Sequence, residues 1–230
     1  MADYVISCCS TADLTHEHFV QRDIQYIPFH FALDGVDYPD DLGKSIAFED
    51  FYKAMANGAE TRTSQVNVHE FEEYFSRFAA DGKDVLHLTL SSGISGVINS
   101  AQNAAELVME KFPGRKVVIV DSLGASSGYS LLMDRLADLR DEGMPFDEIC
   151  AWALENRLHL HHWFFSTTLE YYVKGGRVSK AAGWFGGLLN ICPLLNMDDL
   201  GRLIPRYKEI GRSTRLNSSH PTTSRMPSSA

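Results

Sequence analysis

Val85-Leu-His-Leu-Thr-Leu90, followed directly by Ser91-Ser-Gly-Ile-Ser-Gly96, is the stretch that decides the fold. The first part is mainly aliphatic, and such a short apolar run predicts a strand that is buried on both faces. The second part consists mostly of small and hydroxyl-bearing residues, which predict a turn. Residues 101–108 then follow a helical pattern. A buried strand, a small turn and a helix in this order form the repeating unit of a parallel α/β sheet.

The same order of features occurs at two other places in the chain. Tyr4-Val-Ile-Ser-Cys-Cys9 precedes the turn Ser10-Thr-Ala-Asp13. Lys116-Val-Val-Ile-Val120 precedes a small, hydroxyl-rich turn at 121–128 and a helical pattern at 129–136. Apolar strands that alternate with helices predict a domain of the α/β class, with a parallel sheet and flanking helices.

Further elements are expected between and after these three units. We expect strands at 24–31 and 161–165, helices at 48–55, 168–174 and 179–195, a polar loop at 59–67 and a hairpin at 196–206 that turns at 198–201. The character of the chain changes near residue 160. We therefore predict an N-terminal α/β domain at 1–158, a partial second domain at 159–212 and a non-native tail at 213–230.

The tail from Ser213 onward differs in composition from the rest of the chain. It contains no acidic residue and little of the periodicity that forms a core, which by composition predicts disorder. Its two blocks resemble the translation of a sequencing adapter, and such segments are excluded from fold reasoning. We expect the native sequence to continue differently from about residues 208–212, so that the second domain is incomplete here.

Charge and cysteine content narrow the classes of partner and compartment. The 230 residues include 21 Lys and Arg against 30 Asp and Glu, a formal charge of −9, which disfavours a nucleic-acid partner. No apolar run is long enough to span a bilayer, and the N-terminus lacks the features of a secretory signal. The four cysteines form no C-x-x-C pair, as in proteins with reduced thiols. We expect a cytoplasmic protein without stable membrane insertion.

Hydroxyl side chains gather where the expected parallel strands end. Those carboxyl ends carry Ser10 with Thr11, Ser91 with Ser92, and Ser122. Ligands of parallel sheets bind at this edge, and the helices that follow offer free N–H groups and a positive dipole end to an anion. The two central turns contain no Lys or Arg, so a carboxylate fits better than a phosphate. The alternative is that each serine only caps its helix.

Five motifs, in order and in register, resemble the DegV family of bacterial lipid-binding proteins. They are Arg62-Thr-Ser-Gln65 (T-S-Q), Ser91-Ser-Gly-Ile-Ser-Gly96 (S-S-G-x-S-G), Asp121-Ser122 with Ala125-Ser-Ser-Gly128 (D-S-x-x-A-S-x-G), Leu169-Glu-Tyr171 with Gly175-Gly-Arg177, and Leu188-Leu-Asn-Ile-Cys-Pro-Leu194. The resemblance runs from residue 4 to about 208. Two departures matter: Cys9 stands where the family has the aspartate of D-S-T, and the chain stops before the family's head-group histidine.

The resemblance implies a two-domain DegV-like fold that holds a long-chain fatty acid between the domains. The implied carboxylate contacts are the hydroxyls of Thr63 and Ser92 and the amide of Ile94. Ser64, Ser91 and Ser95 are second choices. The acyl chain would lie on apolar surface, for which we expect residues 184–189. The resemblance also implies a carrier in phospholipid metabolism that presents its acid to a fatty-acid kinase. Such a carrier is not an enzyme, has no catalytic residue, and needs no cofactor or metal.

A serine hydrolase of the α/β type is the alternative function. Gly124-Ala-Ser-Ser-Gly128 fits the G-x-S-x-G pattern of a nucleophile elbow, with Ser126 as the nucleophile. An elbow serine stands directly at the turn from strand to helix. Val120 ends the expected strand well before Ser126, so we expect Ser126 inside the helix, where small residues permit close packing.

Two other patterns, a group of histidines and a basic patch, are weaker signals of function. His159, His161 and His162 would point to both sides of a strand, and no nearby cysteine or paired carboxylate completes a metal site. Lys174, Arg177 and Lys180 form a small basic patch that fits either a docking surface of an interaction module or a solvated loop.

Overall fold

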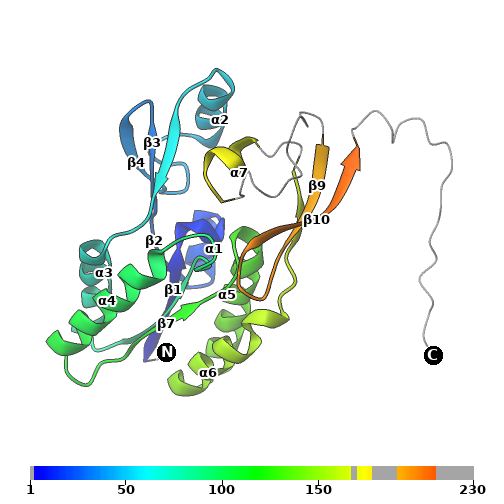
Figure 1. The fold of residues 1–230 in the computed structure, drawn as a ribbon. Coiled ribbons are helices and arrows are strands. Elements are labelled where there is room, and N and C mark those ends of the chain that lie inside the picture. Colours follow the sequence, from blue (N-terminus) through cyan, green and yellow to red (C-terminus); the bar gives the residue numbers. More distant parts are fainter. Residues whose placement is uncertain (1–2, 167–169, 178–190, 211–230) are drawn as a thin grey trace, which may run out of the picture. The chain divides into compact units, whose positions relative to one another are not determined.

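The computed structural model describes residues 3–166, 170–177 and 191–210, and Figure 1 shows the order of their elements. The chain divides into two compact units. The first contains Met1–His162 and Asn196–Ile204, and the second contains Trp163–Leu195 and Pro205–Ala230. The predicted tail at 213–230 lies outside the described residues, and the predicted domain limits stay a prediction.

The first unit is built on a four-stranded parallel sheet in the order β2-β1-β6-β7. Its strands are β1 (Tyr4–Cys9), β2 (Gln25–Ile27), β6 (Asp84–Thr89) and β7 (Val117–Asp121). Ile6 lies opposite Leu86, and Leu88 lies opposite Val120. The three aliphatic runs of the sequence are therefore neighbouring strands, which confirms the predicted parallel sheet.

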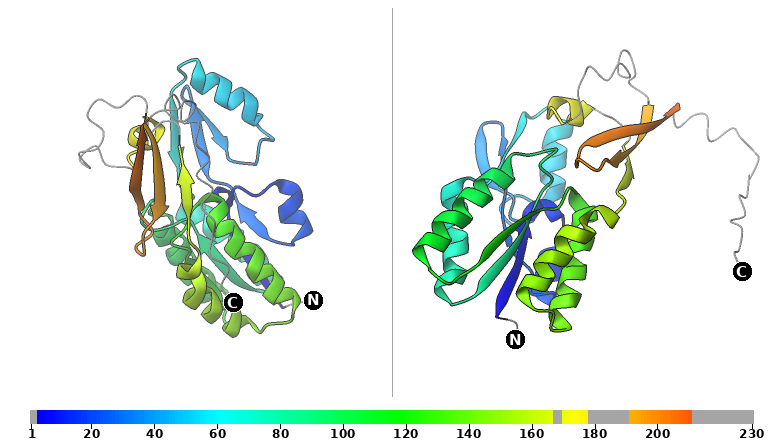
Figure 2. Two further views of the ribbon diagram at one scale, coloured as in Figure 1. Left: turned by 90° about the vertical axis from the view of Figure 1, so that its right-hand side faces the viewer. Right: turned by 60° about the horizontal axis from the view of Figure 1, so that its bottom comes forward.

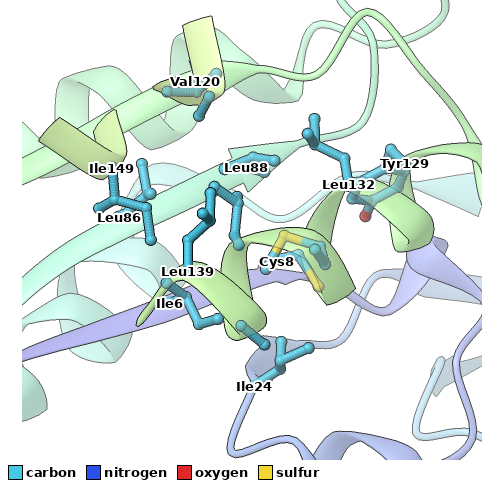
Figure 3. Close-up of a cluster of buried hydrophobic side chains, with 14 of the residues drawn as sticks. Ile6, Cys8, Ile24, Leu86, Leu88, Val120, Tyr129, Leu132, Leu139 and Ile149 are labelled. Atoms are coloured by element: carbon cyan, nitrogen blue, oxygen red, sulfur yellow. The ribbon is translucent and has the colours of Figure 1, made fainter. Parts of the chain in front are cut away.

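Helices cover both faces of this sheet (Figures 1 and 2). On one face, α1 (His16–Gln21), α5 (Ser126–Asp141) and α6 (Phe146–Asn156) enclose a core that includes Ile6, Leu88 and Val120 (Figure 3). On the other face, α3 (Val68–Ala80) and α4 (Val97–Lys111) enclose Val85 and Val117. The two cores take alternate residues of each strand, because successive side chains of a strand point to opposite faces.

A second, antiparallel sheet of the first unit has the order β4-β3-β5. It consists of β3 (His30–Leu33), β4 (Val36–Pro39) and β5 (Thr61–Ser64), and α2 (Phe48–Ala56) confirms the helix expected at 48–55. Phe51 of α2 packs its ring against that of Phe31, with centroids 5.0 Å apart.

Two expectations for this region were wrong. The strand expected at 24–31 is two strands, because the intervening Pro28 has no amide and Phe29 donates its amide to the Ser10 hydroxyl. The loop expected at 59–67 contains β5, because pairing with β3 outweighs the polar composition of that segment.

The remaining sheet has the order β10-β9-β8. Its strands are β8 (Trp163–Phe165), β9 (Ile191–Met197) and β10 (Leu203–Ile210), and α7 (Glu170–Lys174) precedes β9 in the chain. The predicted hairpin at 196–206 is confirmed. The helix expected at 179–195 is wrong for 191–195, which pair as part of β9, and the rest of it lies outside the described residues. Among the described residues there are also two 3₁₀ turns, at Ser10–Ala12 and Arg157–His159.

No helix within residues 3–166, 170–177 and 191–210 combines the length and the apolar character needed to cross a membrane.

Candidate functional site

The turn after β6 holds four of the predicted contacts, namely Ser91, Ser92, Ile94 and Ser95. Ser91 is fully buried, and its amide donates to the carbonyl oxygen of Gly124 at 3.0 Å. Its own carbonyl oxygen accepts from the amides of Ile94 and Ser95, both at 3.0 Å. The Ile94 amide would therefore share its hydrogen with any further acceptor. Ser92 is exposed, so its hydroxyl is open to a ligand.

Asp121, the last residue of β7, is hydrogen-bonded to the backbone of this turn. Its Oδ1 atom accepts from the amide of Ser92 at 3.1 Å and from the amide of Leu123 at 3.0 Å. The side chain is buried between the two turns. Because one carboxylate oxygen serves both amides, the backbone of Ser92 is tied to the turn after the neighbouring strand.

Gln65 joins the T-S-Q segment to the S-S-G turn. Its Oε1 atom accepts from the Ser95 hydroxyl at 3.3 Å, and its Nε2 atom donates to the Ser100 hydroxyl at 3.3 Å. Both serines belong to the start of α4 or the turn before it. Residues far apart in the sequence are thereby brought together, and Thr63 and Ser64 lie just before this link on β5.

Thr63 and Ser64 point to opposite faces of the antiparallel sheet. Thr63 lies opposite Phe31, whereas Ser64 lies opposite His30, one residue earlier on β3. Successive side chains of a strand alternate between faces, so Thr63 shares its face with the Phe31 ring and Ser64 does not. The two hydroxyls therefore have different surroundings, although the sequence places them side by side.

The turn after β1 is closed by internal hydrogen bonds. Ser10 is buried, donates to Asp40 Oδ2 at 2.7 Å and accepts from the Phe29 amide at 3.0 Å. Burial raises the pKa of the Asp40 carboxyl, and the bond from Ser10 opposes that rise. Asp40 thus supplies to Ser10 a carboxylate from another part of the chain, at the strand end where Cys9 stands.

Ser126 is the first residue of α5, not an interior residue as expected, and its φ is +51°. Burial raises the pKa of the Asp13 carboxyl, and a hydrogen bond from the Ser126 side chain opposes that rise. The His162 ring packs on the flanking glycines: a Cβ on Gly128 would lie 1.7 Å from Nδ1, and one on Gly124 would lie 2.7 Å from Cε1. Among the described residues, no hydrogen bond joins Ser126 to a histidine. Burial, and then His161, lower the pKa of His162.

The structure also bears on a metal site, the cysteines and a surface cavity. In the described part of the chain, no cluster of three or more His, Cys, Asp and Glu side chains is arranged to hold a metal ion. Cys8, Cys9 and Cys150 are free thiols and are buried. An open cavity of 320 Å³ is lined by Tyr26, Ile27, Pro28, His30, Glu70, Glu73, Tyr74 and Arg77. It contains none of the six predicted contact residues.

Sequence reasoning missed three residues that shape the site. Asp121 and Gln65 stood inside quoted motifs, but their role depends on which turns meet in space. The third is Gly201 at the tip of the β9–β10 hairpin, whose carbonyl oxygen accepts from the Ser91 hydroxyl at 2.7 Å. The one signal available in the sequence was Asp121, an acidic residue at the end of a parallel strand. A side chain at that position can reach the turn that follows the neighbouring strand.

The chain is similar to several known proteins. A family model described as "Uncharacterised protein, DegV family" matches residues 6–218. A DegV domain-containing protein of Clostridium perfringens is 35% identical over 216 residues, which are 94% of this chain and 74% of the relative.

Two solved structures share the fold. A stearic-acid-binding protein of Eubacterium ventriosum is 28% identical with a TM-score of 0.80, and the match covers 92% of this chain and 72% of that one. A fatty-acid-binding DegV family protein of Thermus thermophilus is 30% identical with a TM-score of 0.78, and the match covers 92% and 73%. The family match over residues 6–218 and the 35% identity to a curated relative show that this chain belongs to the DegV family.

Proposed function

We propose that this protein binds one long-chain fatty acid between its two domains and presents the carboxylate to a partner fatty-acid kinase. The carboxylate is held by the hydroxyls of Thr63 and Ser92, with the Ile94 amide as a further donor. The chain itself supplies no catalytic group, no cofactor and no metal. Relatives of similar sequence and fold that bind stearic or other fatty acids support the ligand class.

The Gln65 link carries the assignment of the head group. It joins the segment of Thr63 to the turn of Ser92, so two hydroxyls from distant segments can act on one anion. The only basic residue in 61–65 and 91–96 is Arg62, which the strand register turns to the face opposite Thr63. A carboxylate held by hydroxyls and an amide stays ionised without a cation, because hydrogen bonds favour the charged form.

The tail is held by apolar contact. Phe31 shares the face of Thr63 and offers apolar surface beside the head group. The segment at 184–189, expected to line the rest of the tail, lies outside the described residues. Burial of each methylene stabilises the complex by about 0.8 kcal/mol, so affinity should increase steeply with chain length.

Binding is tested by native mass spectrometry of the purified protein, followed by lipid extraction. We expect a co-purified acyl chain, or binding of added stearate, and tighter binding of the acid than of its methyl ester. If neither a bound nor an added fatty acid is retained, the proposed function is wrong. Presentation to a kinase is tested by adding a fatty-acid kinase and ATP and trapping the acyl phosphate with hydroxylamine.

A serine hydrolase remains the second candidate, because Ser126 stands at a helix start with a positive φ, as an elbow nucleophile does. A histidine base bonded to the serine would complete the arrangement, and His162 lies on the neighbouring glycines without such a bond. Labelling of Ser126 by a phosphonate probe, together with ester turnover that Ser126→Ala abolishes, would favour the enzyme over the carrier.

A further inference from the structure

The turn at 198–202, at the tip of the β9–β10 hairpin, is stabilised by its own side chains. Asp198 Oδ1 accepts from the amides of Leu200 at 3.1 Å and Arg202 at 2.8 Å. Asp198 Oδ2 also accepts from Arg202 Nε at 2.8 Å. Gly201 adopts a φ of +68°, which favours glycine because it has no Cβ.

This hairpin turn contacts the S-S-G turn through buried polar atoms. The Ser91 hydroxyl donates to the Gly201 carbonyl oxygen at 2.7 Å and accepts from the Gly93 amide at 3.1 Å. Ser91 and Gly201 are both buried. A Cβ on Gly201 would lie 2.0 Å from Ser91 Oγ, and one on Gly93 would lie 2.4 Å from the Gly201 oxygen. Both positions lack a side chain where the two backbones meet.

The contact between the two turns is connected to Ser92 in two ways. Ser91 is its chain neighbour, and Asp121 accepts from the amides of Ser92 and Leu123. Gly201 also lies against Leu123, because its Cβ would be 3.1 Å from the Leu123 Cα atom. Three turns, after β6, after β7 and at 198–202, are thus joined by Ser91 and Asp121. The backbone of Ser92 cannot shift without disturbing this junction.

We infer that Ser91 and Asp121 are positioning residues for Ser92. Ser91 docks the hairpin turn on the S-S-G turn, and Asp121 ties the Ser92 backbone to the turn after β7. Ser91 serves this contact rather than the ligand, since its hydroxyl already uses a donor and an acceptor bond. Docking of the 198–202 turn and binding of a head group at Ser92 are then linked, and each stabilises the other by the same factor. This linkage rests on the proposed fatty-acid binding, whereas the contact between the turns does not.

Hydrogen exchange of the ligand-free protein tests the contact. In Ser91→Ala, the amides of Gly201 and Arg202 should exchange roughly five to ten times faster than in the wild type, the effect of one lost buried hydrogen bond. Ser76→Ala is the matched control, because its buried hydroxyl has no hydrogen-bond partner among the described residues, and exchange at 198–202 should not change. Unchanged exchange in Ser91→Ala would overturn the positioning role of Ser91.

Added stearate tests the linkage. It should slow exchange at 198–202 in the wild type. Ser91→Ala should weaken stearate binding to the extent that it lowers the fraction of molecules with a docked turn. Asp121→Ala should weaken the binding of stearate more than the binding of stearyl alcohol. Asp121→Asn keeps an acceptor oxygen, so it should recover most of the stearate binding that Asp121→Ala loses. Equal losses for both ligands would mean that Asp121 is merely structural.

The experiments distinguish a failure of the linkage from a failure of the proposed fatty-acid binding. If stearate binds and leaves exchange at 198–202 unchanged, the linkage is wrong and the proposed function stands. If stearate does not bind at all, the proposed function and the linkage are both wrong, while the ligand-free exchange still decides the contact between the turns.

Discussion

His87, in the middle of β6, should make the protein sensitive to acid. Its side chain is fully buried, with Nδ1 2.9 Å from the Ser7 hydroxyl and Nε2 3.7 Å from Cys9 Sγ. The rings of Phe71 and Phe75 enclose it. Burial lowers the pKa of His87 from 6.5 to about 3, because the imidazolium would lose its hydration without gaining a counter-ion.

The magnitude follows from proton linkage. The unfolded chain binds a proton at His87 below about pH 6.5, and the folded chain does so only near pH 3. Folding stability from this residue is therefore complete above about pH 6.5 and is lost as the pH falls toward 3. Between pH 8 and pH 5, the loss is about 2 kcal/mol. In urea this corresponds to a midpoint lower by about 1 M.

Urea unfolding followed by far-ultraviolet circular dichroism at pH 8 and pH 5 measures this loss. His87→Asn removes the titrating group, keeps a polar atom near Ser7 and leaves all other histidines in place. We expect the wild type to lose about 2 kcal/mol more than the variant between the two pH values. Equal losses in both proteins would refute the argument, since they would show that His87 is not held neutral by burial.

Other substitutions test the site. Thr63→Ala and Ser92→Ala should each weaken fatty-acid binding by roughly 1–3 kcal/mol in isothermal titration, and non-additively in the double variant. Ser64→Ala, on the other face of β5, should cost less, and a loss as large as that of Thr63→Ala would contradict the assignment. Gly128→Ala should destabilise the protein by about 1–3 kcal/mol in thermal melts, because the new Cβ meets the His162 ring. Helix propensity alone predicts a gain at Gly128, so a raised melting temperature would count against that packing.

The sequence alone was enough to predict the parallel sheet. Its aliphatic runs are short, continuous and followed by small turns, and only a sheet covered on both faces buries such runs completely. Local patterns failed where pairing between distant segments decides the structure. β5 is polar and was expected to be a loop, and residues 191–195 were expected to be helical, yet both form strands because a partner strand satisfies their backbone groups.

The site divides in the same way. The strand-end rule pointed to Ser92, since the turns that follow parallel strands meet at one edge of the sheet, whereas Thr63 came from the resemblance of the T-S-Q segment to a family motif. Only the tertiary structure placed Thr63 and Ser64 on opposite faces of a sheet with Phe31 on the side of Thr63, because the face of a strand residue depends on its register with β3. It also gave the Ser91 hydroxyl a buried partner, Gly201, more than a hundred residues away. No local pattern encodes such a contact, because it exists only once the hairpin has docked.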